Sequence, residues 1–385
     1  MTKDNDFIKE IDSLKKSPLF ALSLGGKEIS HSNFWAWLIE QEKDGKNPYI
    51  KVFMPNFYKN NYVFKSVNRE KNNTDVSIEY EDANGNLFVF VIENKLKAVP
   101  SLQQLKNYQE KCTTKKQKFG GGLLTGVKST LDLPDSKEWN FISYEEISRR
   151  IDKINGETKD IAYIDIIEQY TMDILNISKL MKTKLENTKG EYIFQDDYLE
   201  EIRFADIFAK LKGSELVNRI NERLSKEGKR FKDYKKWRSP IAELSFNNKK
   251  PTITIVYKEI EEFGDEETEL GRLGVQIEGN QFRIYGGGTK QDLQENIKSM
   301  KTIEDMMFKS KYLDNNFKEN IKKKDLKTPM KKKFCSYGQK SNSVYYHLYQ
   351  YWNITEIKYD LIIDNIFNQL DIAKELIESG FTFSS

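Results

Sequence analysis

The fragment DVSIEYEDANGNLFVFVIENKLK, residues 75–97, ends an apolar run with charged side chains. Alternating and apolar residues at 75–81 and 87–95 predict two strands, and the ANGN between them predicts a hairpin turn. Glu93 and Lys95 follow directly on the apolar run LFVFVI. A carboxylate and an ammonium at the end of such a strand cost free energy unless they are paired, hydrated or bound to a metal. The fragment therefore predicts two strands of a sheet and a polar site where the second strand ends.

The length of the hairpin loop decides which side chains share a face of the sheet. A two-residue Asn-Gly turn would place Asp75 opposite Asn94, on the face away from Glu93. A three-residue loop, 83–85, pairs Asp75 with Glu93 directly and suits a type I turn followed by a left-handed glycine. We expect the second register, with Lys95 on the same face because it lies two residues from Glu93. Two carboxylates about 4.5–5.5 Å apart at their Cβ atoms repel each other unless a divalent cation lies between them.

The pattern of the whole chain predicts two domains. A length of 385 residues exceeds that of one typical domain, and the polar, glycine-containing segment 186–192 is typical of a boundary. We therefore expect domains at 1–188 and 189–385. In the first we expect strands at 121–126 and 139–143 besides the hairpin, and helices at 7–16, 31–41 and 101–112. A further helix should begin at 144, and a long one should end at about 186. In the second we expect four strands between 242 and 286, and helices at 196–212, 214–227 (with Ser214 as N-cap), 290–308, 311–324 and 358–379.

Composition and charge exclude several classes of protein. Lys and Arg total 62 against 59 Asp and Glu, a net charge of +3, so binding to a polyanion requires a local patch. Cys112 and Cys335 lie far apart without CxxC spacing, which argues against a disulfide framework or a zinc site and suits a reducing cytoplasm. The polar start differs from a signal peptide, and no apolar run approaches the roughly 18 residues of a membrane span. We therefore expect a cytoplasmic protein without a membrane segment.

Several motifs resemble those of one nuclease family. Asp75 followed by Glu93-Asn94-Lys95 resembles the D…(D/E)xK signature of the PD-(D/E)XK nuclease superfamily. Gln104 and Tyr108, in QQLKNY, resemble the QxxxY element of its RecB-like branch. Further segments resemble its bacterial stand-alone and defence-linked members, namely KEISHSNFWAWLIE at 27–40, GGLLTG at 121–126 and WNFISYEEI at 139–147. The resemblance covers about residues 20–180, and it departs from the pattern at Thr74, where proline is usual.

This resemblance implies a fold and an activity. The fold would be α/β, a restriction-endonuclease-like mixed sheet flanked by helices, with a C-terminal α+β domain for target recognition, sensing or oligomerisation. The activity would be Mg²⁺-dependent hydrolysis of phosphodiester bonds, with Mn²⁺ as a substitute and DNA favoured over RNA as the substrate of an endonuclease. A role in restriction or phage defence, a homodimer and a partner from a defence operon follow from the same analogy. The alternative is a nucleic-acid-binding, regulatory or assembly protein that keeps the fold without turnover.

The resemblance also implies a role for each matching residue. Asp75 and Glu93 would bind the metal together with the backbone carbonyl of Asn94, and Lys95 would hold the attacking water. Gln104 would orient that water or the lysine. The plainer alternatives are a strand-end ion pair between Glu93 and Lys95, and a surface position for Gln104.

Other residues have less specific patterns. Glu28 would either cap the following helix or act as an accessory carboxylate near the metal, His31 would make a structural hydrogen bond, and Tyr108 would contact nucleic acid. The run IKKKDLKTPMKKK at 321–333 carries seven lysines and one aspartate. It is either a solvated face or a set of phosphate contacts formed by Lys322, Lys323, Lys324, Lys331, Lys332 and Lys333.

Overall fold

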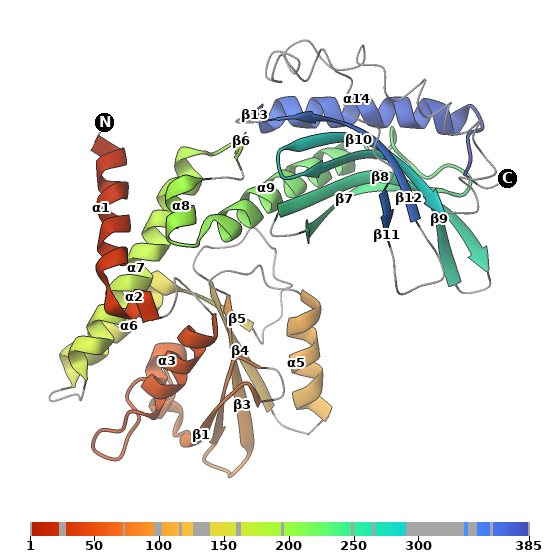
Figure 1. The fold of residues 1–385 in the computed structure, drawn as a ribbon. Coiled ribbons are helices and arrows are strands. Elements are labelled where there is room, and N and C mark those ends of the chain that lie inside the picture. Colours follow the sequence, from red (N-terminus) through yellow and green to blue (C-terminus); the bar gives the residue numbers. More distant parts are fainter. Residues whose placement is uncertain are drawn as a thin grey trace. The chain divides into compact units, whose positions relative to one another are not determined.

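The structure, a computed structural model, forms two compact units (Figure 1). The first unit comprises residues 1–187 and 196–208, and the second comprises 188–195 and 209–385. The chain therefore enters the second unit at Thr188, returns to the first for thirteen residues, and then leaves it. The residues described are 2–22, 28–71, 74–95, 102–114, 118–125, 139–158, 163–193, 196–247, 250–263, 266–289, 335–337, 345–354 and 357–383.

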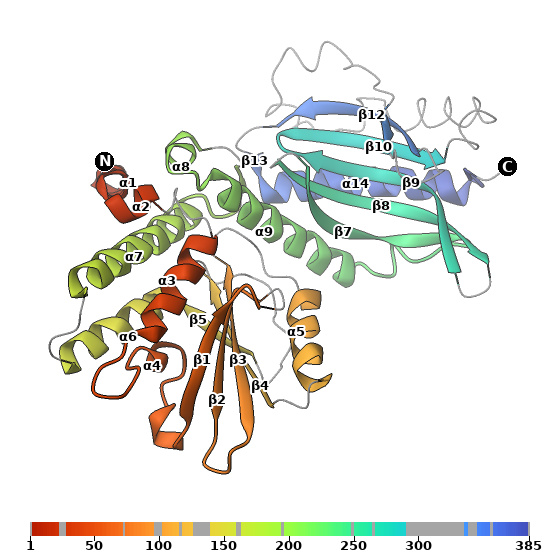
Figure 2. The same ribbon diagram turned by 60° about the horizontal axis from the view of Figure 1, so that its bottom comes forward.

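A five-stranded mixed sheet forms the centre of the first unit, in the order β1-β2-β3-β4-β5 (Figure 2). Its strands are β1 (Val63–Arg69), β2 (Val76–Glu81), β3 (Leu87–Lys95), β4 (Lys118–Thr125) and β5 (Trp139–Ser143). Strand β2 pairs antiparallel with both β1 and β3, whereas β4 pairs parallel with both β3 and β5. This arrangement confirms the expected mixed sheet, to which β1 adds a strand that the sequence pattern did not predict.

Helices cover both faces of this sheet. Of the helices of this unit, α3 (Glu28–Glu40), α5 (Leu102–Thr114) and α6 (Tyr144–Glu157) contact its strands. The unit also contains α1 (Thr2–Lys16), α2 (Pro18–Leu22), α4 (Ile50–Phe53), α7 (Ile164–Asn187) and α8 (Asp197–Glu201). Figure 1 shows α3 and α5 on opposite faces of the sheet, and Tyr108 of α5 packs on Val89 and Val91 of β3. The C-terminal end of β3, where charged residues were expected, therefore lies in a sheet that helices cover on both sides.

A glycine in β4 makes room for an aromatic ring. A Cβ atom added to Gly121 would lie 2.5 Å from the ring of Trp139 on the neighbouring strand β5, closer than real atoms approach. The partly buried Trp139 in turn packs against the cluster that contains Tyr108. The missing side chain therefore lets the parallel half of the sheet pack closely beneath α5.

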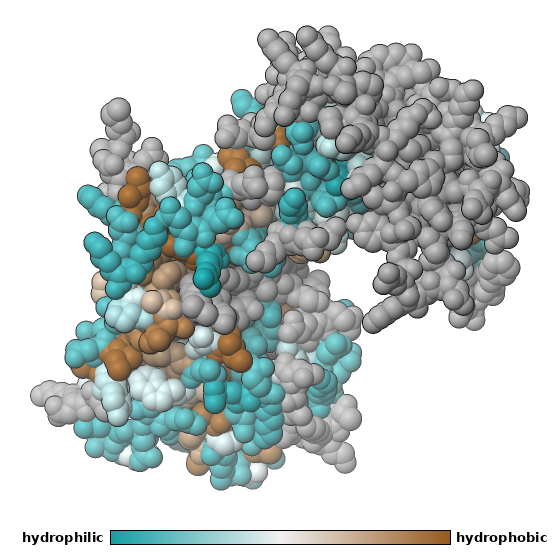
Figure 3. Space-filling model, in the orientation of Figure 1, coloured by the Kyte–Doolittle hydropathy of each residue, from teal (hydrophilic) through white to brown (hydrophobic). Residues whose placement is uncertain are grey.

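The surface of the first unit carries scattered apolar side chains. Figure 3 shows them among hydrophilic ones, in the region of α3 and α6. Ile29, Ile166 and Met172 are among the exposed large apolar residues, which is ordinary for a folded protein when they do not form one extended patch. None of the described helices has both the length and the apolar character needed to cross a membrane.

The second unit is an α+β structure built on an antiparallel sheet of order β11-β12-β10-β9-β8-β7. Its strands are β7 (Trp237–Asn247), β8 (Lys250–Phe263), β9 (Glu266–Glu278), β10 (Gln281–Thr289), β11 (Cys335–Tyr337) and β12 (Tyr345–Asn353). Two helices, α9 (Ala205–Lys226) and α14 (Tyr359–Glu378), bury apolar residues against the sheet in one core. A small sheet pairs β6 (Glu191–Tyr192) with β13 (Ile357–Lys358). The expected α+β character is confirmed, as are the β9–β10 hairpin and the last helix.

Two helix boundaries predicted for this region are wrong. A helix was expected over 196–212, but α8 ends at Glu201 and α9 begins only at Ala205. The sequence favoured two helices, with Ser214 as the N-cap of the second, but α9 runs unbroken from Ala205 to Lys226. Gly213 does not interrupt the helix because it serves close packing: an added Cβ would lie 3.1 Å from the side chain of Leu244 and 3.3 Å from Pro251. Packing of the helix on the sheet therefore overrides the local preference of glycine and serine for a helix end.

A side chain of α9 also binds the backbone of β7, which is the end strand of the sheet as described. The carboxamide of Asn221 accepts a hydrogen bond from the N–H of Ala242 (2.9 Å) and donates one to the carbonyl of the same residue (3.0 Å). Both main-chain groups of Ala242 are thus satisfied by a helix rather than by another strand.

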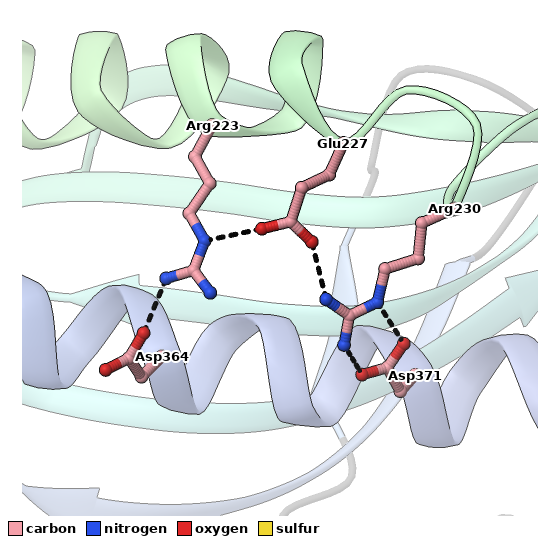
Figure 4. A network of polar contacts seen from close by, with 5 residues as sticks. All are labelled: Arg223, Glu227, Arg230, Asp364 and Asp371. Carbon is pink, nitrogen blue, oxygen red and sulfur yellow. Dashed lines mark hydrogen bonds and ion pairs between the residues drawn. The ribbon is translucent and has the colours of Figure 1, made fainter.

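A chain of ion pairs joins α9 to α14 (Figure 4). Arg223 contacts Glu227 (2.8 Å) and Asp364 (2.5 Å), and Glu227 in turn contacts Arg230 (2.5 Å). Arg230 binds both carboxylate oxygens of Asp371, one of them at 2.9 Å. These side chains are partly exposed, so the network lies at the rim of the core and not within it.

Candidate active site

The pairing of β2 with β3 confirms the expected hairpin register. Val76 lies opposite Ile92, and the same register continued by one residue sets Asp75 opposite Glu93. The acidic residue that precedes the first strand therefore lies across from the acidic residue near the end of the second. Had the register slipped by one position, these two side chains would lie on opposite faces.

The turn that fixes this register has the expected chemistry. The N–H of Gly85 donates to the carbonyl of Asp82 (3.0 Å), and Gly85 adopts a left-handed φ of 75°. The N–H of Asp82 donates to the carbonyl of Asn86 (3.1 Å), which closes a three-residue loop. The carboxylate of Asp82 accepts the N–H of Asn86 (2.9 Å), and its hydrogen bonds to that residue lower the pKa of Asp82.

Asp75 is joined directly to the end of β3. Its Oδ2 atom accepts a hydrogen bond from the backbone N–H of Asn94 at 2.7 Å. Burial raises the pKa of Asp75, while the Asn94 hydrogen bond and the charge of Lys95 act in the opposite direction. One carboxylate oxygen is therefore fixed against the strand that carries the other charged residues.

Glu93 and Lys95 form a buried ion pair on the same face of β3. A carboxylate oxygen of Glu93 lies 2.5 Å from the Nζ atom of Lys95, and the two side chains are 0% and 10% exposed. Burial, followed by the charge of Asp75, raises the pKa of Glu93 to about 7, although Lys95 and a hydrogen bond from Tyr108 lower it. Among the described residues, these two carboxylates thus share the site with the ammonium of Lys95, and additional positive charge there would stabilise both.

The donor atoms at this site fit a hard divalent cation. Asp75 and Glu93 offer carboxylate oxygens, and Asn94 between Glu93 and Lys95 offers a backbone carbonyl. No group of three or more His, Cys, Asp or Glu side chains in the described parts of the chain is arranged to hold a metal. Mg²⁺ does not need such a group, because it commonly takes one or two carboxylates and completes its shell with water. These residues would therefore suit Mg²⁺ better than a metal that needs a full set of protein ligands.

Comparison with known families decides the classification. The family model for the PD-(D/E)XK nuclease superfamily matches residues 19–266, more than half of the chain. The chain belongs to the PD-(D/E)XK nuclease superfamily. Comparison with curated proteins and with solved structures finds no match.

Membership of the PD-(D/E)XK superfamily indicates nuclease activity in general. Its members typically hydrolyse phosphodiester bonds and commonly use divalent metal ions. The match extends beyond the range of about 20–180 over which the sequence motifs were recognised, and it includes all of β7 and β8 in the second unit. The family pattern is therefore not confined to the sheet that carries Asp75 and Glu93.

Two of the other residues singled out in this PD-(D/E)XK chain are buried in the first unit. His31 is 2% exposed, and its Nδ1 atom lies within hydrogen-bonding distance of the Tyr170 hydroxyl, a contact suited to a structural role. Tyr108 is 4% exposed and hydrogen-bonds to Glu93. Tyr108 therefore contacts a candidate metal ligand, and its expected contact with nucleic acid stays a prediction.

The remaining expectations fall on parts that are not described. Glu28 begins α3 and Gln104 lies on α5, but their side chains are outside the described residues. The same holds for the predicted helices at 290–308 and 311–324, and for the lysines at 322–324 and 331–333. Their roles stay predictions.

The sequence pattern did not single out Tyr144 as a functional residue. Tyr144 is the first residue of α6, and its hydroxyl donates to the side-chain oxygen of Asn94. The motif SYEEI predicted only the start of a helix, and in the structure Ser143 caps that helix by accepting the N–H of Glu146 at 3.2 Å. A hydrogen bond between residues fifty positions apart leaves no local signal that could have identified it.

Proposed function

We propose that this chain is a Mg²⁺-dependent endonuclease that hydrolyses phosphodiester bonds, with DNA as its preferred substrate and Mn²⁺ as an effective substitute. The observation that supports the proposal most is the pairing of Asp75 with Glu93 across the hairpin, with Lys95 in contact with Glu93. Two carboxylates and one ammonium at the end of a buried strand are costly for folding but suited to a metal and a phosphate.

The residues divide the chemical work between them. Asp75, Glu93 and the backbone carbonyl of Asn94 would hold Mg²⁺, which when bound supplies positive charge to the phosphate oxygens and makes water more acidic. Lys95 would hold the attacking water and stabilise the negative charge that builds up on the phosphorus oxygens. Gln104 would orient that water or Lys95. The sheet provides a rigid mount, which such a site requires because its groups must hold their geometry closely.

The two parts of the chain would have different tasks. Residues 1–188 would carry out cleavage, and 189–385 would recognise the target, sense a signal or form a homodimer. A cytoplasmic role in restriction or phage defence, with an operon partner, is supported by resemblance to the family alone. The lysines of the 321–333 run would bind phosphates of the nucleic acid.

A cleavage assay with the purified chain tests the proposal. Supercoiled DNA, linear duplex, single-stranded DNA and RNA are incubated with Mg²⁺, Mn²⁺ or EDTA. We expect cleavage of supercoiled and linear duplex DNA with either metal, and none with EDTA. Binding of nucleic acid without cleavage in any metal would instead favour the alternative, a regulatory or assembly protein that keeps the fold. Cleavage that survives chelation would contradict the metal mechanism.

A further inference from the structure

The side chain of Asn94 has a role of its own in the geometry of the site. Because side chains alternate along a strand, it points to the face of the sheet opposite Glu93 and Lys95. There it is fully buried, and its Oδ1 atom accepts a hydrogen bond from the Tyr144 hydroxyl. Its backbone N–H donates to Asp75 at 2.7 Å. Asn94 is thus fixed at its side chain by one residue and at its backbone by another.

Tyr144 is itself firmly placed. It is fully buried, and it is the first residue of α6, directly after the N-cap Ser143. Its ring centroid lies 6.4 Å from that of the buried Trp35 of α3. A large ring enclosed in this way has little freedom to move its hydroxyl, so the hydrogen bond fixes Asn94 relative to α6 and α3 as well as to the sheet.

We propose that Tyr144 is a positioning residue for the metal site and acts through the side chain of Asn94. The hydrogen bond would hold the Asn94–Lys95 peptide so that its carbonyl points to the metal, and would keep the Asn94 N–H aimed at Asp75. This inference rests on the proposed function, because it concerns the same metal. Residues that orient metal ligands from the second layer typically change metal affinity or activity by about 10- to 100-fold when they are removed.

A purely structural role would have a different signature. A buried tyrosine that only holds the core together would lower stability when its hydroxyl is removed, but it would leave metal affinity unchanged. The chain offers a matched control for this distinction. Tyr49, also fully buried, donates to the side-chain oxygen of Asn155 at 2.7 Å. Asn155 lies on α6 as Tyr144 does, so both substitutions remove a tyrosine–asparagine hydrogen bond made by one helix.

The first experiment is a Mn²⁺ titration of the full-length chain, followed by calorimetry or by electron paramagnetic resonance. We expect Tyr144→Phe to weaken Mn²⁺ binding about 10-fold or more, and Tyr49→Phe to leave it as in the native chain. Melting temperatures measured in EDTA should fall by similar amounts in both variants. Native Mn²⁺ affinity in a folded Tyr144→Phe variant would overturn the inference.

A second set of variants tests whether Tyr144 acts through Asn94. Asn94→Ala removes the side-chain acceptor but keeps the backbone N–H and carbonyl. Once that acceptor is absent, Tyr144→Phe should change Mn²⁺ affinity by less than about twofold, because coupled residues are not additive. If the double variant instead loses Mn²⁺ affinity by the product of the two single-variant factors, Tyr144 acts by another route and the proposal is contradicted.

Mn²⁺ binding by Asp75→Ala distinguishes a wrong metal site from a wrong role for Tyr144. If Asp75→Ala binds Mn²⁺ as the native chain does, or if the native chain binds none, the metal site is assigned wrongly and the positioning role falls with it. If Asp75→Ala loses binding while Tyr144→Phe does not, the metal site stands and only the inference about Tyr144 is wrong.

Discussion

The ammonium of Lys95 lies 2.5 Å from a carboxylate oxygen of Glu93, two residues earlier on the same buried strand. Taking two charges out of water costs free energy that their mutual attraction only partly offsets. Asp75, opposite Glu93, adds a second negative charge and helps to raise the pKa of Glu93. An arrangement that is unfavourable for folding and strongly perturbs a carboxyl group is typical of a functional site.

Each of the three charged residues should be essential for cleavage. We expect Asp75→Ala, Glu93→Ala and Lys95→Ala each to lower the rate of plasmid cleavage by about 10³-fold or more, since members of one site act as a unit. A matched control is Glu79→Ala on strand β2 of the same hairpin, where Glu79 pairs with Lys71 at the surface. The control should cut at the native rate; a native rate in any of the three site variants would refute the assignment.

The buried carboxyl group of Asp173 should make stability depend on pH. Burial raises its pKa, although hydrogen bonds from Ser17 and Gln169 lower it. Because the pKa is higher in the folded state, the folded chain favours the protonated form. Protonation of Asp173 therefore stabilises the folded chain. This contribution is complete when the pH is below the unfolded pKa of about 3.9, and it is lost as the pH rises through the pKa of the folded state.

The substitution Asp173→Asn removes this titration. The melting temperature of the variant should exceed that of the native chain at pH 7, and the difference should shrink as the pH approaches 4. Asp152→Asn, at an exposed position of α6, serves as the control for the loss of one carboxylate. A difference at Asp173 that stays constant between pH 4 and pH 7 would rule out the titration.

The ion pairs between α9 and α14 should contribute modestly to the second unit. Arg230 binds Asp371 and Glu227, so Arg230→Ala should lower the free energy of unfolding by about 1 kcal/mol, near the upper end for exposed pairs. The loss should shrink in 1 M salt, where the Debye length is about 3 Å. Urea unfolding measures both values. Lys374→Ala, which removes a 3.8 Å pair with Glu378, should have almost no effect; an equal effect of the two variants would contradict this view of the network.

The lysine run should strengthen nucleic-acid binding without sequence preference. Replacing Lys331, Lys332 and Lys333 with Gln should weaken binding to all duplexes. It should also flatten the slope of log affinity against log salt by about 0.9 for each phosphate that the variant no longer neutralises. The control removes the same charge at three exposed lysines, Lys229, Lys232 and Lys235. Equal affinity and slope in the native chain and the first variant would show that the run is only a solvated face.

The hairpin of the site could be predicted because its determinants are local. The loop sequence selects the turn, the turn selects the register, and the register decides that Asp75 faces Glu93. The apolar run ending at Lys95 supplied the strand boundary. These interactions lie within about twenty residues, where sequence patterns carry most of their information.

Other features depend on residues far apart in the chain. Strand β1 was missed because VFKSVNR lacks a buried face: none of its seven residues is fully buried. The break predicted at Ser214 was wrong because Leu244 and Pro251 pack against Gly213. Tyr144 was overlooked because its partner, Asn94, lies on another element. In each case tertiary packing, which no local pattern encodes, decides the outcome.

The pairing of Asn221 with Ala242 has a consequence for how copies of this chain behave at high concentration. A strand at the end of a sheet can recruit a strand from another molecule, and apolar side chains beside it make aggregation easier. Strand β7 carries two exposed apolar side chains, Ile241 (62% exposed) and Phe246 (40% exposed). Because the Asn221 carboxamide already occupies the N–H and carbonyl of Ala242, an incoming strand cannot continue its ladder of hydrogen bonds past this point. The side chain of Asn221 thus protects the edge strand β7 from pairing with a strand of another molecule.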